Sequence, residues 1–166
     1  MGKTYKLTPL HNRTDFDCGN QALNKYIRSS VDRDIHNRLT QCYVALDQSE
    51  ESVIGFYTLS NFTVSTAQLP RKYARKIPLG YLVPTILLGR LAVDLNYQAQ
   101  GLGGFLLVDS MHRSLSAAKI SNAYALVTHA KDDKAVNFYK HYGFLQLAEN
   151  PRHLFLPLKT IEQNLL

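Results

Sequence analysis

The stretch Gln98-Ala99-Gln100-Gly101-Leu102-Gly103-Gly104 decides the fold of this chain of 166 residues. It follows an apolar run over residues 85–93, which predicts a strand buried on both faces, and it opens a segment with helical periodicity. Glycines at such a junction let the first N–H groups of the helix point at one spot, where the helix dipole adds partial positive charge. The stretch therefore predicts a strand, a loop and a helix that together bind a pyrophosphate or a similar anion.

Two other phosphate-binding loops match this stretch less well. A Walker loop places Lys and then Ser or Thr after its second conserved glycine, and no Lys follows Gly103 or Gly104. The dinucleotide fingerprint G-x-G-x-x-G, started at Gly101, requires a third glycine where the chain has Leu106. A glycine-rich turn without a ligand stays open as an alternative, because short glycine motifs often occur by chance.

Short strands and helices alternate along the rest of the chain. Strands are predicted over residues 4–7, 41–46, 53–60, 85–93, 122–128, 144–148 and 153–158. The predicted helices begin after Asn20, at Gly101 and at Asp132, and the third of them ends at Gly143. Residues 61–83 are expected to form a loop with one helical turn, and residues 159–166 a tail. This order of elements predicts a mixed α/β (α+β) fold around one central sheet.

The composition is that of one globular domain over residues 1–166 with a surplus of positive charge. Hydrophobic residues make up 45% of the chain, which argues against intrinsic disorder. No apolar run approaches the roughly 20 residues of a membrane span, and no signal peptide is evident. The two cysteines, Cys18 and Cys42, are too few for a disulfide framework or a structural zinc site. We therefore expect a cytoplasmic protein, and its 19 Lys and Arg against 13 Asp and Glu, a net charge of +6, suggest an anionic partner.

A second motif, Ala135-Val136-Asn137-Phe138-Tyr139-Lys140-His141-Tyr142-Gly143-Phe144, lies on a later predicted helix. With both motifs in this order, the chain resembles the GNAT superfamily of acetyl-CoA-dependent N-acetyltransferases. The family's loop pattern, Gln/Arg-x-x-Gly-x-Gly/Ala, matches Gln98, Gly101 and Gly103. Its later A-x-x-F/L-Y-x-x-x-G-F signature matches Ala135, Phe138, Tyr139, Gly143 and Phe144. The resemblance covers essentially the whole chain and implies a GNAT fold, in which helices flank a mixed, mostly antiparallel sheet.

Three further segments are similar to the GNAT toxins of bacterial type II toxin–antitoxin systems. These segments are Phe16–Gly19, Gly55–Ser60 and Leu88–Asp94. The similarity implies a toxin that acetylates the α-amino group of aminoacyl-tRNA and thereby blocks translation. It also implies a ribbon-helix-helix antitoxin as partner and a homodimer as the assembly.

Tyr139 is the candidate general acid for the acetyl transfer that the resemblance implies. A phenol has a pKa near 10, so it stays protonated at neutral pH and can protonate a departing thiolate. The alternative is a core aromatic residue, and Tyr142 on the same helix is a weaker candidate for the acid. The resemblance assigns acetyl-CoA contacts to Leu91, Ala92, Val93, Gln98, Ala99, Gln100, Gly101, Leu102, Gly103, Gly104, Ala135 and Phe138. The chain departs from the family at Asp132, where many relatives have Asn, and helix capping explains this residue equally well.

No general base is evident in the sequence. Asp94 and His129 are weak candidates, because lone polar residues at strand ends are more often structural. An α-amine has a pKa of about 7.7–8.0, whereas a Lys side chain has about 10.4, so an α-amine needs less help to lose its proton. The missing base therefore favours an α-amine as the acceptor.

A basic cluster in the predicted loop is the candidate RNA-binding surface. It consists of Arg71, Lys72, Arg75 and Lys76, and Tyr73 within it is a candidate for stacking on a base. Arg90 interrupts an apolar strand, so it either pairs with a carboxylate or faces the acceptor groove. In the second case the resemblance to the toxins implies that it binds an RNA phosphate. A solvated basic loop is the alternative for the cluster.

Two other functions stay open at this point. The first is a GNAT enzyme that acetylates a small amine or a protein N-terminus. The second is a non-catalytic module that binds acyl-CoA or RNA on the same fold. The aminoacyl group of the acceptor does not follow from the sequence.

Overall fold

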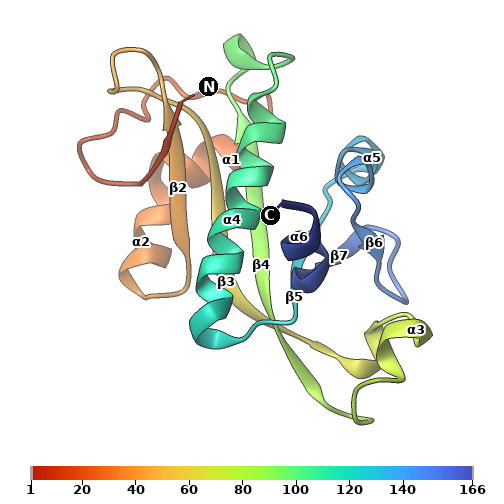
Figure 1. Cartoon of the computed structure of the whole chain (residues 1–166). Helices are drawn as coiled ribbons and strands as arrows, with labels where there is room; N and C mark the ends of the chain where they lie inside the picture. Colours follow the sequence, from red (N-terminus) through yellow and green to blue (C-terminus); the bar gives the residue numbers. More distant parts are fainter. Residues whose placement is uncertain (1, 166) are drawn as a thin grey trace. The chain divides into compact units, whose positions relative to one another are not determined.

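The computed structural model of the protein describes residues 2–165, and its strands form one sheet (Figure 1). The strands are β1 (Thr4–Lys6), β2 (Gln41–Leu46), β3 (Val53–Ser65), β4 (Leu82–Val93), β5 (Ala125–His129), β6 (Leu145–Gln146) and β7 (His153–Pro157). Within the described residues the sheet has seven strands in the order β1-β2-β3-β4-β5-β7-β6. The pairs β1–β2, β2–β3, β5–β7 and β6–β7 are antiparallel, and β4–β5 is parallel. The predicted mixed, mostly antiparallel sheet is therefore confirmed.

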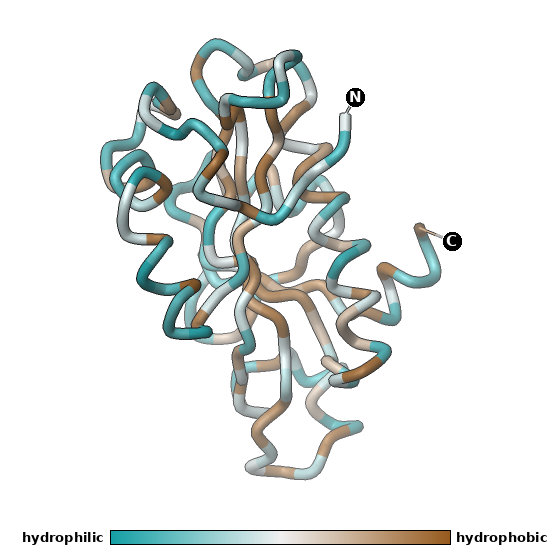
Figure 2. The backbone as a smooth tube through the Cα atoms, turned by 90° about the vertical axis from the view of Figure 1, so that its left-hand side faces the viewer, coloured by the Kyte–Doolittle hydropathy of each residue, from teal (hydrophilic) through white to brown (hydrophobic). Residues whose placement is uncertain are grey.

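The helical elements lie between these strands. They are α1 (Gln21–Lys25), the π-helical η1 (Tyr26–Ser30), α2 (Val31–His36), the 3-10 turns η2 (Thr66–Gln68) and η3 (Leu95–Tyr97), α3 (Arg71–Ala74), α4 (Leu102–Ser121), α5 (Asp133–His141) and α6 (Leu158–Leu165). No helix within residues 2–165 is both long and apolar enough to cross a membrane. Figure 2 shows hydrophobic residues gathered along the strands, whereas the helices alternate between hydrophilic and hydrophobic turns.

The chain divides into two compact units, and β3, β4 and α4 contribute residues to both. The first unit contains the residues up to Ser60 together with Gly89–Ser110. The second contains Asn61–Leu88 and the residues from Met111 onward.

The core of the first unit lies where α1, η1 and α2 pack on β2 and β3. Tyr26, Ile27 and Val31 from the helices are buried with Val44 and Phe56 from the strands. Leu23 and Ile35 pack at the edge of this cluster, so the predicted apolar stripe of the first helix is confirmed. The π-helical turn that divides this helix was not predicted, and π-helical turns occur frequently at functional sites.

The core of the second unit lies on β5 and β7. Val127 and Phe155 are fully buried there, with Val64, Val83 and Leu147 around them. This burial follows from the pairing of β5 with β4 on one side and β7 on the other, which leaves no edge of β5 open to water.

Two sequence predictions about this second unit need correction. The loop expected over residues 61–83 is shorter, because β3 continues to Ser65 and β4 begins at Leu82, whereas the helical turn expected within it is α3. Between these strands, the backbone N–H of Ser65 donates to the side chain of Gln68 (2.8 Å) in a capping box that starts η2. The predicted tail is helix α6, which forms because Leu158 and Ile161 are buried on one side of it. Residue 166 lies outside the described residues.

Candidate functional site

The glycine-rich stretch forms a turn that leads directly into α4, as predicted. Ala99 and Gly101 both have positive φ, at 60° and 83°, a backbone conformation that is uncommon for alanine. Helix α4 begins at Leu102 and runs for 20 residues, so its first backbone N–H groups have no partner within the helix. The strand, loop and helix are therefore confirmed, and their geometry suits a bound anion.

Two glutamines of this loop make hydrogen bonds that hold its backbone. Gln98 donates from Nε2 to the carbonyl oxygens of Val93 (2.9 Å) and Cys18 (3.2 Å). Gln100 donates to the carbonyl oxygen of Asn96 at 3.2 Å. Because these amide groups are engaged with the protein, the N–H groups at the start of α4 are the better candidates for cofactor contacts. The direct contacts predicted for Gln98 and Gln100 stay predictions.

The first half of α4 is anchored closely on β3. A Cβ at Gly55 would lie 2.9 Å from Leu106 Cδ1 and 3.3 Å from Leu102 Cδ2, so glycine lets these leucine side chains of the helix pack directly against the strand backbone. The carboxylate of Asp109 accepts hydrogen bonds from the hydroxyl groups of Tyr57 (2.5 Å) and Thr4 (2.6 Å). The N-terminus of α4 is thus held in place by contacts made within the first unit.

The cofactor segment predicted at Leu91–Val93 lies beyond the end of a strand ladder. The parallel pairing of β4 with β5 ends at Leu88 and Thr128, while β4 itself continues to Val93. Ala92 is buried in the core of the first unit, and Leu91 and Val93 are half-buried. Backbone contacts between this segment and a pantetheine arm stay a prediction.

Tyr139 is held by aromatic neighbours within the second unit. Helix α5 begins where the Asp132 side chain accepts a hydrogen bond from the Ala135 N–H (2.8 Å), which confirms the predicted cap. The Tyr139 ring contacts those of Phe138 and Phe144, with centroids 5.2 and 5.4 Å away. Burial raises the pKa of the Tyr139 phenol, and a hydrogen bond with the Thr128 side chain opposes this shift. The phenol is therefore protonated at neutral pH, as a general acid requires.

Thr128 connects this phenol to the end of the strand ladder. Its buried hydroxyl donates to the carbonyl oxygen of Leu88 at 3.0 Å. Tyr142, the weaker candidate acid, is half-buried, and its ring packs against those of Phe138 and His141. Packing is therefore the better account of Tyr142.

The two candidate bases, Asp94 and His129, are both engaged in contacts within the protein. Both carboxylate oxygens of Asp94 accept backbone hydrogen bonds, from Asn96 (2.9 Å) and Asp17 (3.0 Å). His129 stacks on His153 with ring centroids 3.9 Å apart, and burial and that neighbour lower its pKa. The geometry therefore favours a capping role for Asp94 and leaves His129 neutral at pH 7.

The predicted RNA-binding cations lie on α3 and directly after it. Arg71, Lys72, Arg75 and Lys76 are all exposed. The ring of Tyr73, in contrast, packs edge-on against Phe155 with centroids 5.3 Å apart, and the Lys72 ammonium lies 5.7 Å from its centre. The four cations are exposed and their contact with RNA stays a prediction, whereas Tyr73 packs on the core of the second unit rather than forming an open stacking surface.

The structure decides against the carboxylate partner expected for Arg90, while its proposed contact with the acceptor stays a prediction. Its guanidinium lies over the ring of Tyr26, 3.5 Å from the centroid, and no carboxylate pairs with it in the described part of the chain. The Tyr26 hydroxyl donates to Asp34 at 3.0 Å. Burial and this hydrogen bond raise the pKa of Tyr26 to about 12, so the ring stays neutral beneath the cation. The salt bridge that was one of the two alternatives is thus absent from the described residues, and a cation–π contact holds Arg90 instead.

A groove along α1 was not predicted from the sequence. It encloses about 780 Å³ and is lined by Asp17, Gly19, Gln21, Ala22, Asn24, Lys25, Arg28 and Ser29. Lys25 and Arg28 are both exposed, and Arg28 also donates to the carbonyl oxygen of Phe16. Their spacing of three residues places them on the same face of a helix, and this spacing could have indicated the groove from the sequence.

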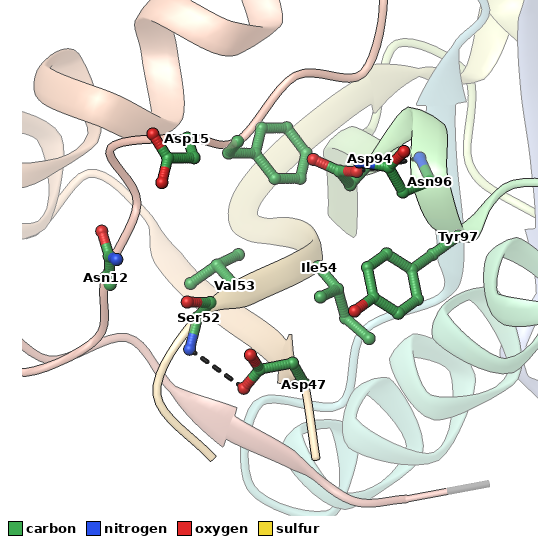
Figure 3. A pocket seen from close by; sticks show the side chains of 10 residues that line it. Asn12, Asp15, Asp47, Ser52, Val53, Ile54, Asp94, Asn96 and Tyr97 are labelled. Atoms are coloured by element: carbon green, nitrogen blue, oxygen red, sulfur yellow. Dashed lines mark hydrogen bonds between the residues drawn. The ribbon is translucent and has the colours of Figure 1, made fainter. Parts of the chain in front are cut away.

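A smaller pocket lies beside the start of the glycine-rich loop, and Figure 3 shows its lining side chains. It encloses about 150 Å³ and includes Asp15, Asp47 and Asp94. Asp47 accepts hydrogen bonds from Ser49 (2.8 Å) and from the Ser52 N–H (3.2 Å), which hold its pKa below the ordinary value. Asp47 and Asp94 therefore stabilise turns through their hydrogen bonds, and no cluster of metal ligands occurs among residues 2–165.

Comparisons with known proteins agree with this geometry. A model of the acetyltransferase (GNAT) domain matches residues 38–146. A tRNA-acetylating toxin of Mycobacterium tuberculosis is 36% identical over 146 residues, which are 88% of this chain and 86% of that protein.

Two solved structures of the toxin AtaT are also similar. AtaT complexed with acetyl-methionyl-tRNAfMet is 33% identical, with a TM-score of 0.91 over 99% of each chain. A tyrosine-to-phenylalanine mutant of AtaT, bound to the C-terminus of the antitoxin AtaR and acetyl-CoA, is 30% identical with a TM-score of 0.81. That match covers 97% of this chain and 96% of the other. This chain therefore belongs to the GNAT family and is an acetyltransferase.

Proposed function

We propose that this enzyme transfers the acetyl group of acetyl-CoA to the α-amino group of aminoacyl-tRNA, and that it acts as the toxin of a toxin–antitoxin pair in the cytoplasm. The observation that carries the proposal is the similarity to AtaT complexed with acetyl-methionyl-tRNAfMet, which extends over 99% of both chains. A similarity confined to the cofactor loop would support acetyl transfer alone. One that extends over the whole chain also supports the same class of acceptor.

The first turn of α4 fits the pyrophosphate of acetyl-CoA. Gly101 has the positive φ that the turn requires, and the free N–H groups at the start of α4 supply uncharged donors. Bound there, acetyl-CoA supplies an acetyl thioester as the group to be transferred. Gln98 keeps the loop in position through its hydrogen bonds to Val93 and Cys18.

Tyr139 acts as the general acid in this proposal. It holds a proton at its phenolic oxygen, and burial raises its pKa, so the proton is present throughout the neutral range. Transfer forms an N–C bond and breaks the C–S bond, so the sulfur must gain a proton and the amine must lose one. About half or more of an α-amine with a pKa of about 7.7–8.0 is neutral at pH 8, which fits a site without an evident base.

The exposed cations are the proposed contacts for the tRNA backbone. Arg71, Lys72, Arg75 and Lys76 supply four charges with no carboxylate partner in the described ranges, and Arg90 supplies a fifth held on Tyr26. The uncharged N–H donors at the start of α4 bind the cofactor, so the positively charged side chains are available to bind the phosphates of the acceptor. The partner that we propose is a ribbon-helix-helix antitoxin, and the assembly is a homodimer.

The test is to incubate the protein with labelled acetyl-CoA and total charged tRNA. We expect label on the tRNA fraction that mild alkali releases together with the amino acid. The same tRNA stripped of its amino acids is the matched control and should stay unlabelled. Label that appears only on small amines or on protein would contradict the proposed acceptor while leaving the acetyltransferase assignment intact.

A further inference from the structure

One buried hydroxyl on β3 has no hydrogen-bond partner among the described residues, whereas other buried threonine hydroxyls have one. Thr58 is 0% exposed, and its Oγ1 lacks a hydrogen bond among residues 2–165. By contrast, Thr40 donates to the carbonyl oxygen of Leu59 (3.0 Å) and Thr85 to that of Phe62 (3.1 Å). An unpaired buried hydroxyl destabilises the folded state. A hydrogen-bond partner from outside the chain would explain why a hydroxyl occupies this position.

The neighbour of this hydroxyl is a glycine in the interior of β4. Gly89 is exposed, and a Cβ at this position would lie 3.1 Å from Thr58 Oγ1. Its φ lies outside the left-handed region, so the backbone does not require glycine here. A glycine inside a strand weakens it and often marks the close approach of a ligand. Space beside Thr58, rather than backbone conformation, is thus the physical reason for Gly89.

The residues that follow Gly89 supply the other parts of an acceptor site. Arg90 is held on Tyr26 at 3.5 Å, and no carboxylate among residues 2–165 pairs with it, so its N–H donors can bind an anion. Leu91–Val93, the proposed segment for the cofactor arm, comes next along β4. The unpaired hydroxyl of Thr58, the gap left by the missing Cβ of Gly89 and the cation of Arg90 therefore all belong to the first unit, and the last two directly precede the cofactor segment along β4.

We propose that Thr58 contacts the acceptor at the gap left by Gly89. Its oxygen accepts a hydrogen bond from the acceptor amine, directly or through one water, and so orients the nitrogen lone pair toward the thioester. The inference rests on the proposed function in one respect, because the amine is assigned to a charged tRNA. Thr58 needs no charge for this role, which suits a site that lacks a general base.

Replacing Thr58 separates this role from a structural one. Thr58→Val keeps the shape of the side chain and removes the hydroxyl, so we expect a higher melting temperature together with a KM for the acceptor raised about 3- to 10-fold. Thr58→Ser keeps the hydroxyl and should restore the KM. Thr85→Val is the matched control: its hydroxyl is bonded to Phe62, so this variant should melt lower and keep the acceptor KM.

Filling the gap gives a second and independent measurement. Gly89→Ala should raise the acceptor KM while the affinity for acetyl-CoA is unchanged, because the new methyl group occupies the space beside Thr58. The double variant Gly89→Ala/Thr58→Ala removes the close contact between the two side chains. If the acceptor uses the gap, the double variant stays impaired, whereas full recovery would show that Gly89→Ala acted only through a clash.

Activity is followed as release of free CoA with charged tRNA and with a small primary amine as alternative acceptors. Thr58 is scored on whichever acceptor the unmodified enzyme uses. An enzyme that uses only the small amine overturns the tRNA proposal and leaves the Thr58 measurement readable. An acceptor KM that is unchanged in Thr58→Val, or one that rises only in step with a lower melting temperature, overturns the role of Thr58.

Discussion

Arg90 lies on the face of Tyr26, with its guanidinium carbon 3.5 Å from the ring centroid. The hydroxyl of the same tyrosine is tied to Asp34 at 3.0 Å, so the ring that supports the cation is itself fixed. A free Arg side chain loses rotamer entropy when it binds a phosphate, whereas a stacked one has already lost part of it. The contact thus prepares Arg90 for binding.

Substitution of Arg90 should weaken binding of the acceptor and leave the affinity for acetyl-CoA unchanged. Arg90→Lys keeps the charge but loses the planar stack and the paired donors, so we expect kcat/KM for charged tRNA to fall roughly tenfold. Tyr26→Leu should have a similar effect, because it removes the support. Tyr26→Phe is the control: it keeps the ring and loses the bond to Asp34, which costs about 1 kcal/mol of stability with little loss of kcat/KM. Equal activity of Arg90→Lys and the unmodified enzyme would contradict this role.

Tyr139→Phe should lower kcat about 100-fold or more and leave acetyl-CoA binding intact. The change removes one oxygen, and the ring contacts with Phe138 and Phe144 remain, so the fold should persist. Tyr142→Phe is the matched control on the same helix and should keep most of the activity. Binding is measured by calorimetry and turnover by CoA release. Near-normal turnover of Tyr139→Phe would remove the acid role.

The pH profile distinguishes the two classes of acceptor. Tyr139 must be protonated to act as an acid, and burial raises its pKa, so it should cause no loss of activity below about pH 10. An α-amine must be neutral to attack, so kcat/KM should rise with pH up to about 8 and then level off. A Lys-like acceptor, with a pKa of about 10.4, would instead keep the rate rising beyond pH 9.

The parts of the site that were predictable are those set by neighbours in the sequence. The cap of α5 at Asp132 and its end at Gly143, where φ is 96°, depend on residues within a few positions, so the motif around Tyr139 could be located in advance. The glycine-rich loop is local in the same sense. Both motifs therefore lie on the expected elements.

The features that escaped prediction depend on partners far away in the chain. The extension of β3 to Ser65 depends on pairing with the neighbouring strand β4, and the nearby Pro70 and Pro78 made the sequence look like a loop. Helix α6 forms because Leu158 and Ile161 are buried in the folded chain. The stack of Arg90 on Tyr26 joins residues 64 positions apart (90 − 26 = 64). Whether the Thr58 hydroxyl finds a hydrogen-bond partner depends on which residues the neighbouring strands place beside it, so no pattern within β3 predicts that it has none.

The basic cluster on and after α3 should control the dependence of activity on salt. Neutralising Arg71, Lys72, Arg75 and Lys76 to Gln removes four exposed cations, so the slope of log affinity against log salt should flatten by about 3 if all four contact phosphates. Acetylation of charged tRNA should fall, and acetylation of a small amine should not. Lys119→Gln, which removes one exposed cation near the end of α4, is the control. An unchanged salt slope would contradict the cluster as the RNA contact.

Gly101→Ala should weaken acetyl-CoA binding by roughly tenfold or more, because the positive φ of 83° is unfavourable for alanine and the turn must shift the first N–H groups of α4. Gly80→Ala tests whether backbone strain alone explains the result. Gly80 has a similar φ of 75°, and a Cβ there would meet no atom within 4 Å. Both variants should lose comparable stability in urea, but only Gly101→Ala should raise the Kd for acetyl-CoA. If Gly80→Ala raises that Kd equally, general destabilisation is the cause and the loop does not hold the pyrophosphate.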